Sequence, residues 1–245
     1  MRSVFSRSSR LVSVPAVLLA TLVLLSATAE AASSGTPRTS SVLTSAKRAI
    51  GKQTSVHLVV TSSSTSTSVR EHLEADLEKT SGVETISEGS EKAIIKVTPS
   101  YAYLSGNSSG LAKIFGLSSA QVLKVGTDWV SVKAGTTQYK DLAASMTISS
   151  VASVLPTAKG TKLYTPVPPA KNLYTLKWDT AATSSEPAWA TTLTLSAIGA
   201  TLPVQETSTG SGGASEKVAF SKWGEHILVS APAVGSTIPF SKVSG

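Results

Sequence analysis

The pentapeptide Gly106-Asn107-Ser108-Ser109-Gly110 is the part of the sequence that most closely matches an enzyme motif. It fits the pattern G-x-S-x-G, in which a nucleophilic serine lies on a sharp turn between a strand and a helix. The order of the chain also allows a triad in which Ser108 is followed by Asp179 or Glu206 and then by His226. The sequence therefore permits a serine hydrolase as one hypothesis.

The elements predicted around this pentapeptide do not favour hydrolase chemistry. A nucleophile elbow needs a parallel sheet whose strands alternate with helices. The strands predicted in the last third of the chain instead follow one another without crossover helices. The chain is also rich in glycine and serine, so such a pattern arises by chance. We therefore favour a turn that ends one strand and caps the next helix.

Other residues able to bind metals or transfer protons are scattered. His57, His72 and His226 lack the spacing of three or four residues that brings two imidazoles to one face of a helix. The acidic run over residues 71–78 alternates as a strand does, and it has no Asp-rich loop with a glycine bend of the kind that binds calcium. These patterns predict no metal and no cofactor.

Composition limits the class of protein further. The chain has 245 residues, of which 41% are hydrophobic and 15% charged, and this suits one large β-rich domain. It has no cysteine, which excludes disulfides, thiol catalysis and cysteine-bound metals. The formal charge is +7 with scattered lysines, so we expect no nucleic-acid interface. Weak association with an anionic envelope membrane is compatible with this charge.

Residues 1–31 match a secretory signal peptide. Three arginines precede an apolar segment over residues 11–25. Ala29-Glu30-Ala31 is the favoured small-residue cleavage site, and Ala27-Thr28-Ala29 is the alternative. A retained membrane anchor is the alternative, but about 15 apolar residues are fewer than the roughly 20 that span a bilayer. Removal of the three arginines and one glutamate of this segment would leave a charge of +5. Residues 32–40 follow as a disordered polar spacer, and we expect one domain over residues 41–240.

Period-two and helical patterns predict the elements of this domain. Alternation predicts strands over residues 55–61, 69–77, 83–87, 93–97, 101–103, 129–132, 174–178, 189–195, 201–206, 217–220 and 226–229. A Ser/Thr-rich hairpin loop is expected over residues 61–68, and Trp178 and Trp189 are expected to form a cross-strand pair. Helical spacing or capping signals occur near residues 41–50, 111–115, 119–125, 139–144 and 150–155. The last third is expected to contain only strands and turns.

These elements predict an α+β fold that is mostly β. Short connections between successive strands favour a single large, curved antiparallel sheet, a half-barrel, with short helices over its concave face. The stretch from Glu91 to Lys133 places two apolar helices between strands. We expect those two helices to form the lid over the sheet.

Several short segments occur in an order that resembles one family of exported proteins. They are Tyr101-Ala102-Tyr103-Leu104-Ser105-Gly106-Asn107, Trp129-Val130-Ser131-Val132, Leu202-Pro203-Val204 and Phe220-Ser221-Lys222-Trp223-Gly224. Over roughly residues 40–240 the chain resembles the actinobacterial LppX/LprG lipoprotein family. The resemblance implies a half-barrel, similar also to LolA-type carriers, in which helices close an apolar cavity for acyl chains. It implies no catalytic residues.

The resemblance suggests positions for contact with an acyl chain, although the family has no cavity motif. The candidates are apolar residues on the predicted helices: Ile114, Phe115, Leu117, Val122, Leu123, Val151, Val154 and Leu155. The family usually carries a lipobox that ends in cysteine, whereas Leu25-Ser26-Ala27 is followed here by Thr28. Because threonine cannot form the thioether to diacylglycerol, we expect a protein that is not lipid-anchored through cysteine.

The sequence favours a non-catalytic, monomeric binding or carrier protein for a lipid or another long apolar ligand in the cell envelope. Two alternatives stay open. One is a structural or partner-binding envelope domain with a filled core, and the other is a serine hydrolase that uses Ser108. The volume of the cavity discriminates between the first two, because bulky side chains such as Phe115 that meet the sheet directly would leave no room for an acyl chain.

Overall fold

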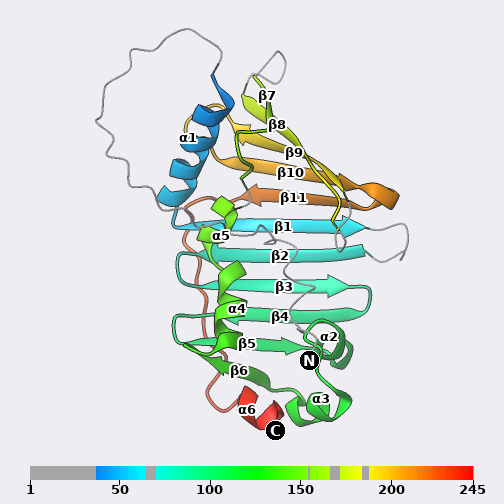
Figure 1. Ribbon diagram of the computed structural model, residues 1–245. Helices are drawn as coiled ribbons and strands as arrows, with labels where there is room; N and C mark the ends of the chain where they lie inside the picture. The colour runs from blue at the N-terminus through cyan, green and yellow to red at the C-terminus, as the bar shows by residue number, and fades with distance from the viewer. Residues whose placement is uncertain (1–36, 64–69, 154, 166–171, 184–187, 245) are drawn as a thin grey trace.

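The structure, a computed structural model, describes residues 37–63, 70–153, 155–165, 172–183 and 188–244 (Figure 1). The predicted signal peptide over residues 1–31 lies outside these residues. So do residues 32–36 of the expected spacer, residues 64–68 of the expected hairpin loop, and Val154. All strands of the described residues belong to one sheet of 12 strands.

The first half of the chain forms an antiparallel meander. Its strands pair in chain order: β1 (Ser55–Ser63), β2 (Arg70–Glu78), β3 (Gly82–Glu88), β4 (Glu91–Val97), β5 (Tyr101–Gly106) and β6 (Trp129–Lys133). Alternation decides which side is buried. Val56, Leu58 and Val60 of β1 are buried together, as the sequence pattern predicts.

The second half adds five antiparallel strands and one parallel strand. The antiparallel strands are β7 (Lys162–Tyr164), β8 (Leu173–Thr180), β9 (Trp189–Ser196), β10 (Pro203–Gly210) and β11 (Ser215–Ser221). Strand β11 pairs with β1 and so joins the two meanders. At the far end, β12 (Thr237–Pro239) pairs in parallel with β6. The edge strands β12 and β7 do not meet, and the sheet is therefore open (Figure 1).

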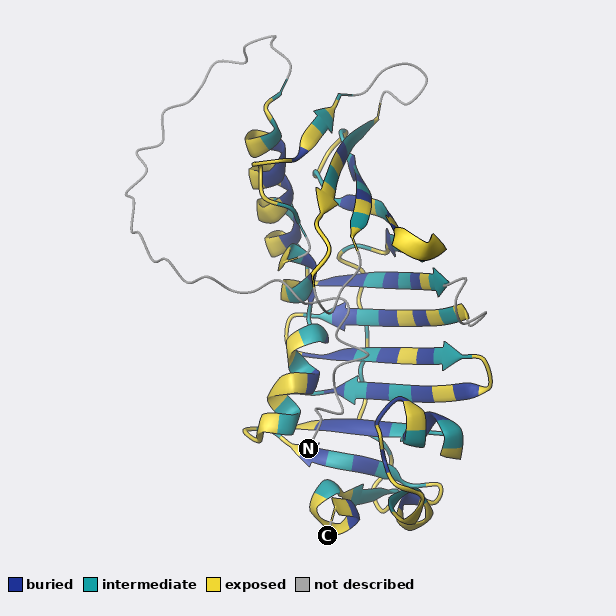
Figure 2. Cartoon of the chain, turned by 45° about the vertical axis from the view of Figure 1, so that its right-hand side comes forward, coloured by how far each residue is buried: buried dark blue, intermediate teal, exposed yellow. Residues whose placement is uncertain are grey.

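Six α-helices lie in the described part of the chain: α1 (Thr39–Lys52), α2 (Ser108–Lys113), α3 (Ser119–Val125), α4 (Thr137–Ser145), α5 (Ile148–Ser153) and α6 (Phe240–Ser244). A single-turn 3-10 helix, η2 (Ser211–Gly213), links β10 to β11. Figure 1 shows α1, α5 and α4 following one another across the strands. In Figure 2 the buried side of α1 is turned toward the sheet. The predicted fold class, a mostly β half-barrel with short helices on its concave face, is confirmed.

The sheet is covered by more helices than the expected pair. Helix α2 packs on β4 and β5 and α3 packs on α6, so the β5–β6 connection covers one end of the sheet. Helix α4 contacts β5 and β6, and the α4–α5 junction reaches β3. At Gly82 of β3 the carbonyl oxygen of Met146, which follows α4, lies so close that a Cβ atom would collide with it. Glycine at this position lets the α4–α5 junction rest directly on the sheet.

The prediction of a strand over residues 226–229 is wrong, and so is the expectation of a helix-free last third. After β11 the chain crosses the strands instead of pairing with one of them. The Ser55 hydroxyl donates to the carbonyl of Glu225, and the Lys96 ammonium donates to the carbonyl of Ser230 over 3.4 Å. The chain then forms β12 and α6, in which Val243 is fully buried. Alternation in residues 226–229 has no neighbouring strand to pair with.

The predicted cross-strand pair of Trp178 and Trp189 is also wrong. Trp178 lies opposite Thr191 and Trp189 lies opposite Thr180, so the two tryptophans are only diagonal neighbours. Trp189 packs instead over Gly210, where a Cβ atom would lie 3.2 Å from the indole ring.

Candidate functional site

The pentapeptide over residues 106–110 is a helix cap. The side-chain oxygen of Asn107 accepts hydrogen bonds from the amides of Gly110 (2.8 Å) and Lys92 (3.1 Å), and its amide nitrogen donates to the carbonyl of Ser90 (2.8 Å). A Cβ atom on Gly110 would collide with the Lys92 carbonyl oxygen. Packing and capping therefore account for the glycine and the asparagine of the motif.

Ser108 is not placed as a nucleophile. It is exposed at the start of α2, and within the described residues no hydrogen bond joins it to a histidine or a carboxylate. The preceding strand, β5, has antiparallel neighbours on both sides, unlike the strand before a nucleophile elbow. Asp179 and His226 are exposed on β8 and in the segment after β11. The predicted helix-capping turn is confirmed.

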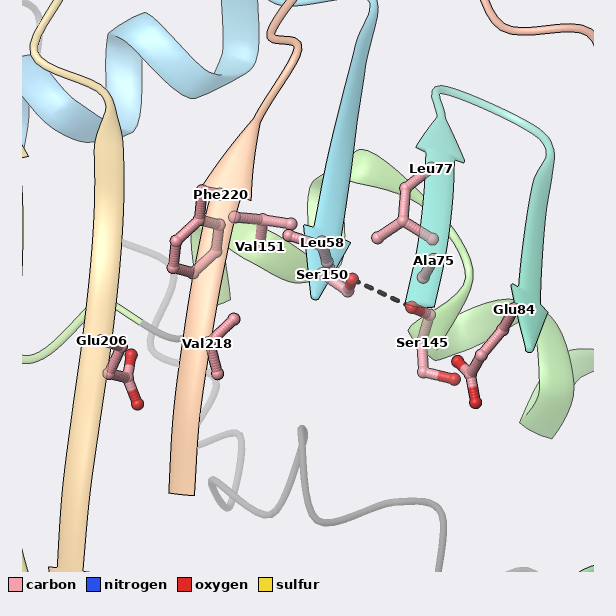
Figure 3. A pocket seen from close by; sticks show the side chains of 10 residues that line it. All are labelled: Leu58, Ala75, Leu77, Glu84, Ser145, Ser150, Val151, Glu206, Val218 and Phe220. Atoms are coloured by element: carbon pink, nitrogen blue, oxygen red, sulfur yellow. Dashed lines mark hydrogen bonds between the residues drawn. The ribbon is translucent and has the colours of Figure 1, made fainter. Parts of the chain in front are cut away.

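A pocket lies on the concave face between the sheet and helices α4 and α5 (Figure 3). Its lining comes from β1, β2, β3, β10 and β11 and from the α4–α5 segment: Leu58, Ala75, Leu77, Glu84, Ser145, Ser150, Val151, Glu206, Val218 and Phe220. The order of these strands is β3-β2-β1-β11-β10. The pocket therefore spans the junction at which the two meanders join.

Strand register brings the apolar side chains of the floor together. Leu58 of β1 pairs with Ala75 of β2 on one side and with Phe220 of β11 on the other. Val218 lies two residues from Phe220 and so points to the same face. Sequence alternation predicts the face of each strand, but the contact between β1 and β11 joins residues more than 150 positions apart.

The roof is held by short-range hydrogen bonds. The Ser150 hydroxyl donates to the carbonyls of Ser145 (3.1 Å) and Thr147 (2.7 Å), which ties α5 to the end of α4 (Figure 3). Ile148 and Val151 on the same helix are buried. Helix α5 also packs against α1, so the roof and the first helix form one layer over the sheet.

Two glutamates interrupt this apolar lining. Glu84 of β3 is only 5% exposed. Burial, followed by the nearby negative charge of Glu71, raises the pKa of Glu84 to about 7. Burial, followed by the charge of Glu216, likewise raises the pKa of Glu206 on β10 to about 7. Within the described residues no hydrogen bond reaches either side-chain carboxyl group.

The sequence patterns did not single out these carboxyl groups as pocket residues. Glu84 shares a face with Ile86 by simple alternation, and this was the available signal. The sequence gives Glu206 a role only in the hypothetical triad with Ser108. Figure 3 shows the two glutamates on opposite flanks of the pocket, with Val218 and Leu58 between them.

Of the predicted ligand contacts on the later helix, Val151 lines the pocket. Leu155 is partly buried and packs against the core. Val154 lies outside the described residues. The structure thus brings one of these three side chains to the pocket, and contact with an acyl chain stays a prediction for all three.

The candidates on the central helices lie toward the β4–β6 end of the sheet. Ile114, Phe115 and Leu117 are buried in the core at 9%, 5% and 9% exposure. Val122 is partly buried, and Leu123 is 83% exposed on α3. None of the five is among the residues that line the pocket. Their contact with a ligand also stays a prediction.

The pocket is small in this arrangement. Its volume is about 30 Å³, on a scale where one water molecule needs about 10–15 Å³. It therefore admits two or three waters, and an acyl chain could enter only if the surrounding groups moved apart. The described residues contain no group of three or more side chains placed to hold a metal ion. Nor do they contain a helix long and apolar enough to cross a membrane.

The fold has similar solved structures. LprF from Mycobacterium bovis matches with a TM-score of 0.50 and 15% identity, over 80% of this chain and 97% of LprF. Lipoprotein LppX from Mycobacterium tuberculosis matches with a TM-score of 0.47 and 15% identity, over 78% of this chain and 99% of LppX. No family model and no curated protein matches the sequence. The likeness to LprF confirms, at the level of fold, the resemblance to the LppX/LprG family.

Proposed function

We propose that the protein is an exported, non-catalytic binding or carrier protein for a lipid or another long apolar ligand of the cell envelope. The observation that carries the proposal is the pocket between the concave face and α4–α5, whose floor is apolar. A fold similar to that of LprF and the LppX/LprG-like order of motifs support the same role. The helix-capping role of the G-x-S-x-G segment supports a function without catalysis.

Burial of apolar surface would supply the affinity. Enclosing a chain of sixteen carbons at about 0.8 kcal/mol per methylene gives a gross gain of about 12 kcal/mol. Ordering the ligand and widening the pocket would offset part of this gain. The remainder is enough for a carrier that must also release its ligand.

Location and contacts belong to the same proposal. The signal-like residues 1–31 support export, and Thr28 supports a protein without a cysteine-linked lipid. We expect a monomer with at most weak association with the envelope membrane. A ligand that extends from the pocket toward α2 would contact Ile114 and Phe115 of the predicted set.

The volume of the pocket favours one second candidate. A space of about 30 Å³ is also what a domain with a filled core would show. In that case the protein would be a structural or partner-binding envelope domain. The two functions differ in whether the native protein carries a lipid.

Extraction of the protein from its native host separates the two candidates. The mature protein would be purified without detergent, extracted with organic solvent and studied by mass spectrometry. A carrier yields a reproducible lipid at a ratio near one per chain. Repeated recovery of empty protein would contradict the carrier and favour the filled core.

A variant that fills the pocket tests whether the lipid binds there. Ala75 is 3% exposed on the pocket floor, so Ala75→Leu adds bulk where the ligand would lie. Ala190 is exposed on β9, and Ala190→Leu is the matched control. We expect at least tenfold less lipid with Ala75→Leu and no change with Ala190→Leu. Equal lipid in both variants would mean that the lipid binds elsewhere.

A further inference from the structure

We propose that the pocket selects an amphiphile whose head group is a protonated amine, and that Glu84 is its principal ion-pair partner, with Glu206 on the opposite flank. The inference rests on the proposed function, because the apolar part of such a ligand would occupy the same pocket. It goes further by naming the charge of the ligand.

Glu84 is the first observation. Its register partners are Ala75 on β2 and Ile95 on β4, both buried and apolar. Glu84 is only 5% exposed and lines the pocket. Its carboxyl group has no hydrogen-bond partner among the described residues. No fully buried side-chain oxygen of the described residues lacks a hydrogen-bond partner, so the carboxyl oxygens of Glu84 keep access to the pocket. A largely buried carboxyl group is costly to ionise, so an apolar residue would be expected at this position if it only filled the core. A cation from a ligand supplies the missing partner.

Glu206 lies on the other flank of the pocket and is half-buried. It pairs with Val218 on β11 and with Leu193 on β9, and no hydrogen bond from a described residue reaches its carboxyl group. Two acidic groups thus face one apolar pocket from opposite sides (Figure 3). No lysine or arginine lines the pocket among the described residues.

Four glutamates lie in register across five neighbouring strands, near one end of these strands. The row is Glu216 on β11, Ser62 on β1, Glu71 on β2, Glu88 on β3 and Glu91 on β4. Alternation puts Glu71 on the face of Ala75 and Glu216 on the face of Val218.

One glutamate of this row already binds a cation. The ammonium of Lys113 on α2 lies 2.5 Å from the carboxylate of Glu91. Carboxylates near the pocket favour the approach of a cation over that of a carboxylate or phosphate.

Release of a proton on binding distinguishes an ion pair with a pocket glutamate from general attraction to the protein surface. The pKa of each pocket glutamate is raised to about 7 by burial and by a neighbouring glutamate. An ammonium placed beside such a group favours its ionised form and lowers its pKa. Binding of an alkylammonium at pH 7 should therefore release a fraction of a proton, whereas binding of an uncharged alcohol should release none.

The test compares three probes of equal chain length below the concentrations at which they aggregate: dodecylamine, 1-dodecanol and laurate. Calorimetric titration of the purified protein in two buffers of different ionisation enthalpy measures both affinity and proton release. We expect dodecylamine to bind about tenfold or more tightly than 1-dodecanol, as charge-assisted hydrogen bonds allow. Laurate should bind most weakly.

Isosteric variants locate the effect. Glu84→Gln should remove most of the preference for the amine and most of the proton release while leaving 1-dodecanol binding unchanged. Glu206→Gln should have the same effect to a smaller extent. The matched control is Glu74→Gln, which changes an exposed carboxylate on the opposite face of β2. This control should change neither quantity.

The outcomes separate the inference from the proposed function. Equal binding of the three probes, or a preference for laurate, would overturn the amine while leaving an apolar carrier intact. A preference that survives both pocket variants and is lost with Glu71→Gln would place the amine at the row of glutamates and overturn the role of Glu84. If none of the probes binds, the proposed function fails together with the inference.

Discussion

The two ends of the concave face are built from the same kind of alternating strand, yet their interiors differ. At the β4–β6 end, Leu111 and Phe115 from the α2 segment are 1% and 5% exposed and join Val130, fully buried on β6, in an apolar core. At the β10–β3 end, α5 brings Val151 to a pocket that also contains Glu84. Glu84 on β3 lies directly opposite Ile95 on β4. The boundary between the apolar end and the pocket end therefore runs between these two strands.

This difference shows what each end can do. A close-packed apolar end fixes the sheet and its edge helices, because any gap there loses dispersion contacts. The pocket end places two carboxyl groups among apolar side chains and is therefore less stable than it could be, and such sites are common where a ligand binds. Each end can be altered by substitutions that leave the other end unchanged.

The largest effect is expected at the filled end. Leu111→Ala removes a side chain that is 1% exposed and should lower the free energy of unfolding by about 2–5 kcal/mol. Urea denaturation measures this loss. Lipid recovered from folded Leu111→Ala protein should be unchanged. A change below 1 kcal/mol would mean that this end is not close-packed.

The next effect concerns pH at the pocket end. The pKa of Glu84 is raised from 4.5 to about 7 in the folded protein, so the folded state binds more protons than the unfolded state between these values. The part of the stability that depends on Glu84 should therefore fall by at most about 3 kcal/mol as pH rises from about 4.5 to 7. Glu206, whose pKa is also raised to about 7, should add a fall of the same sign. Glu84→Gln should make this dependence shallower, leaving the part due to Glu206, and raise the free energy of unfolding at pH 8. Urea denaturation between pH 4.5 and 8 checks it, and stability that rises over this range would contradict it.

A smaller effect separates the helix cap from the enzyme hypothesis. Asn107→Ala removes the acceptor for the Gly110 amide and should cost about 1 kcal/mol. Ser108→Ala at the exposed neighbouring position should stay within about 0.5 kcal/mol. A fluorophosphonate probe should not label Ser108 in the folded protein. Labelling that Ser108→Ala abolishes would revive the hydrolase.

Local features of the fold could be predicted from the sequence because they depend on near neighbours. The Ser118-x-x-Gln121 pattern predicts a capping box, and both of its hydrogen bonds are present at 3.3 and 2.9 Å. Alternation similarly predicts the buried faces of β1 and β2. Such signals need only the few residues that form them.

Features that depend on distant pairing could not be predicted. Residues 226–229 alternate as a strand does, but no strand edge lies beside them. Strand β12 is three residues long and is defined by its parallel partner β6, from which it is separated by more than 100 residues. The pocket has the same origin, since Glu206 and Glu84 meet it only because β11 pairs with β1. Neither glutamate stands in a local motif.

Native mass spectrometry of the protein purified from its own host tests most directly whether the concave face holds a lipid. We expect the intact mass to exceed the mass of the chain by that of one lipid, with the increment lost in Ala75→Leu and kept in Ala190→Leu. A bare mass for the unmodified protein in repeated detergent-free preparations would contradict the carrier and leave a domain with a filled core.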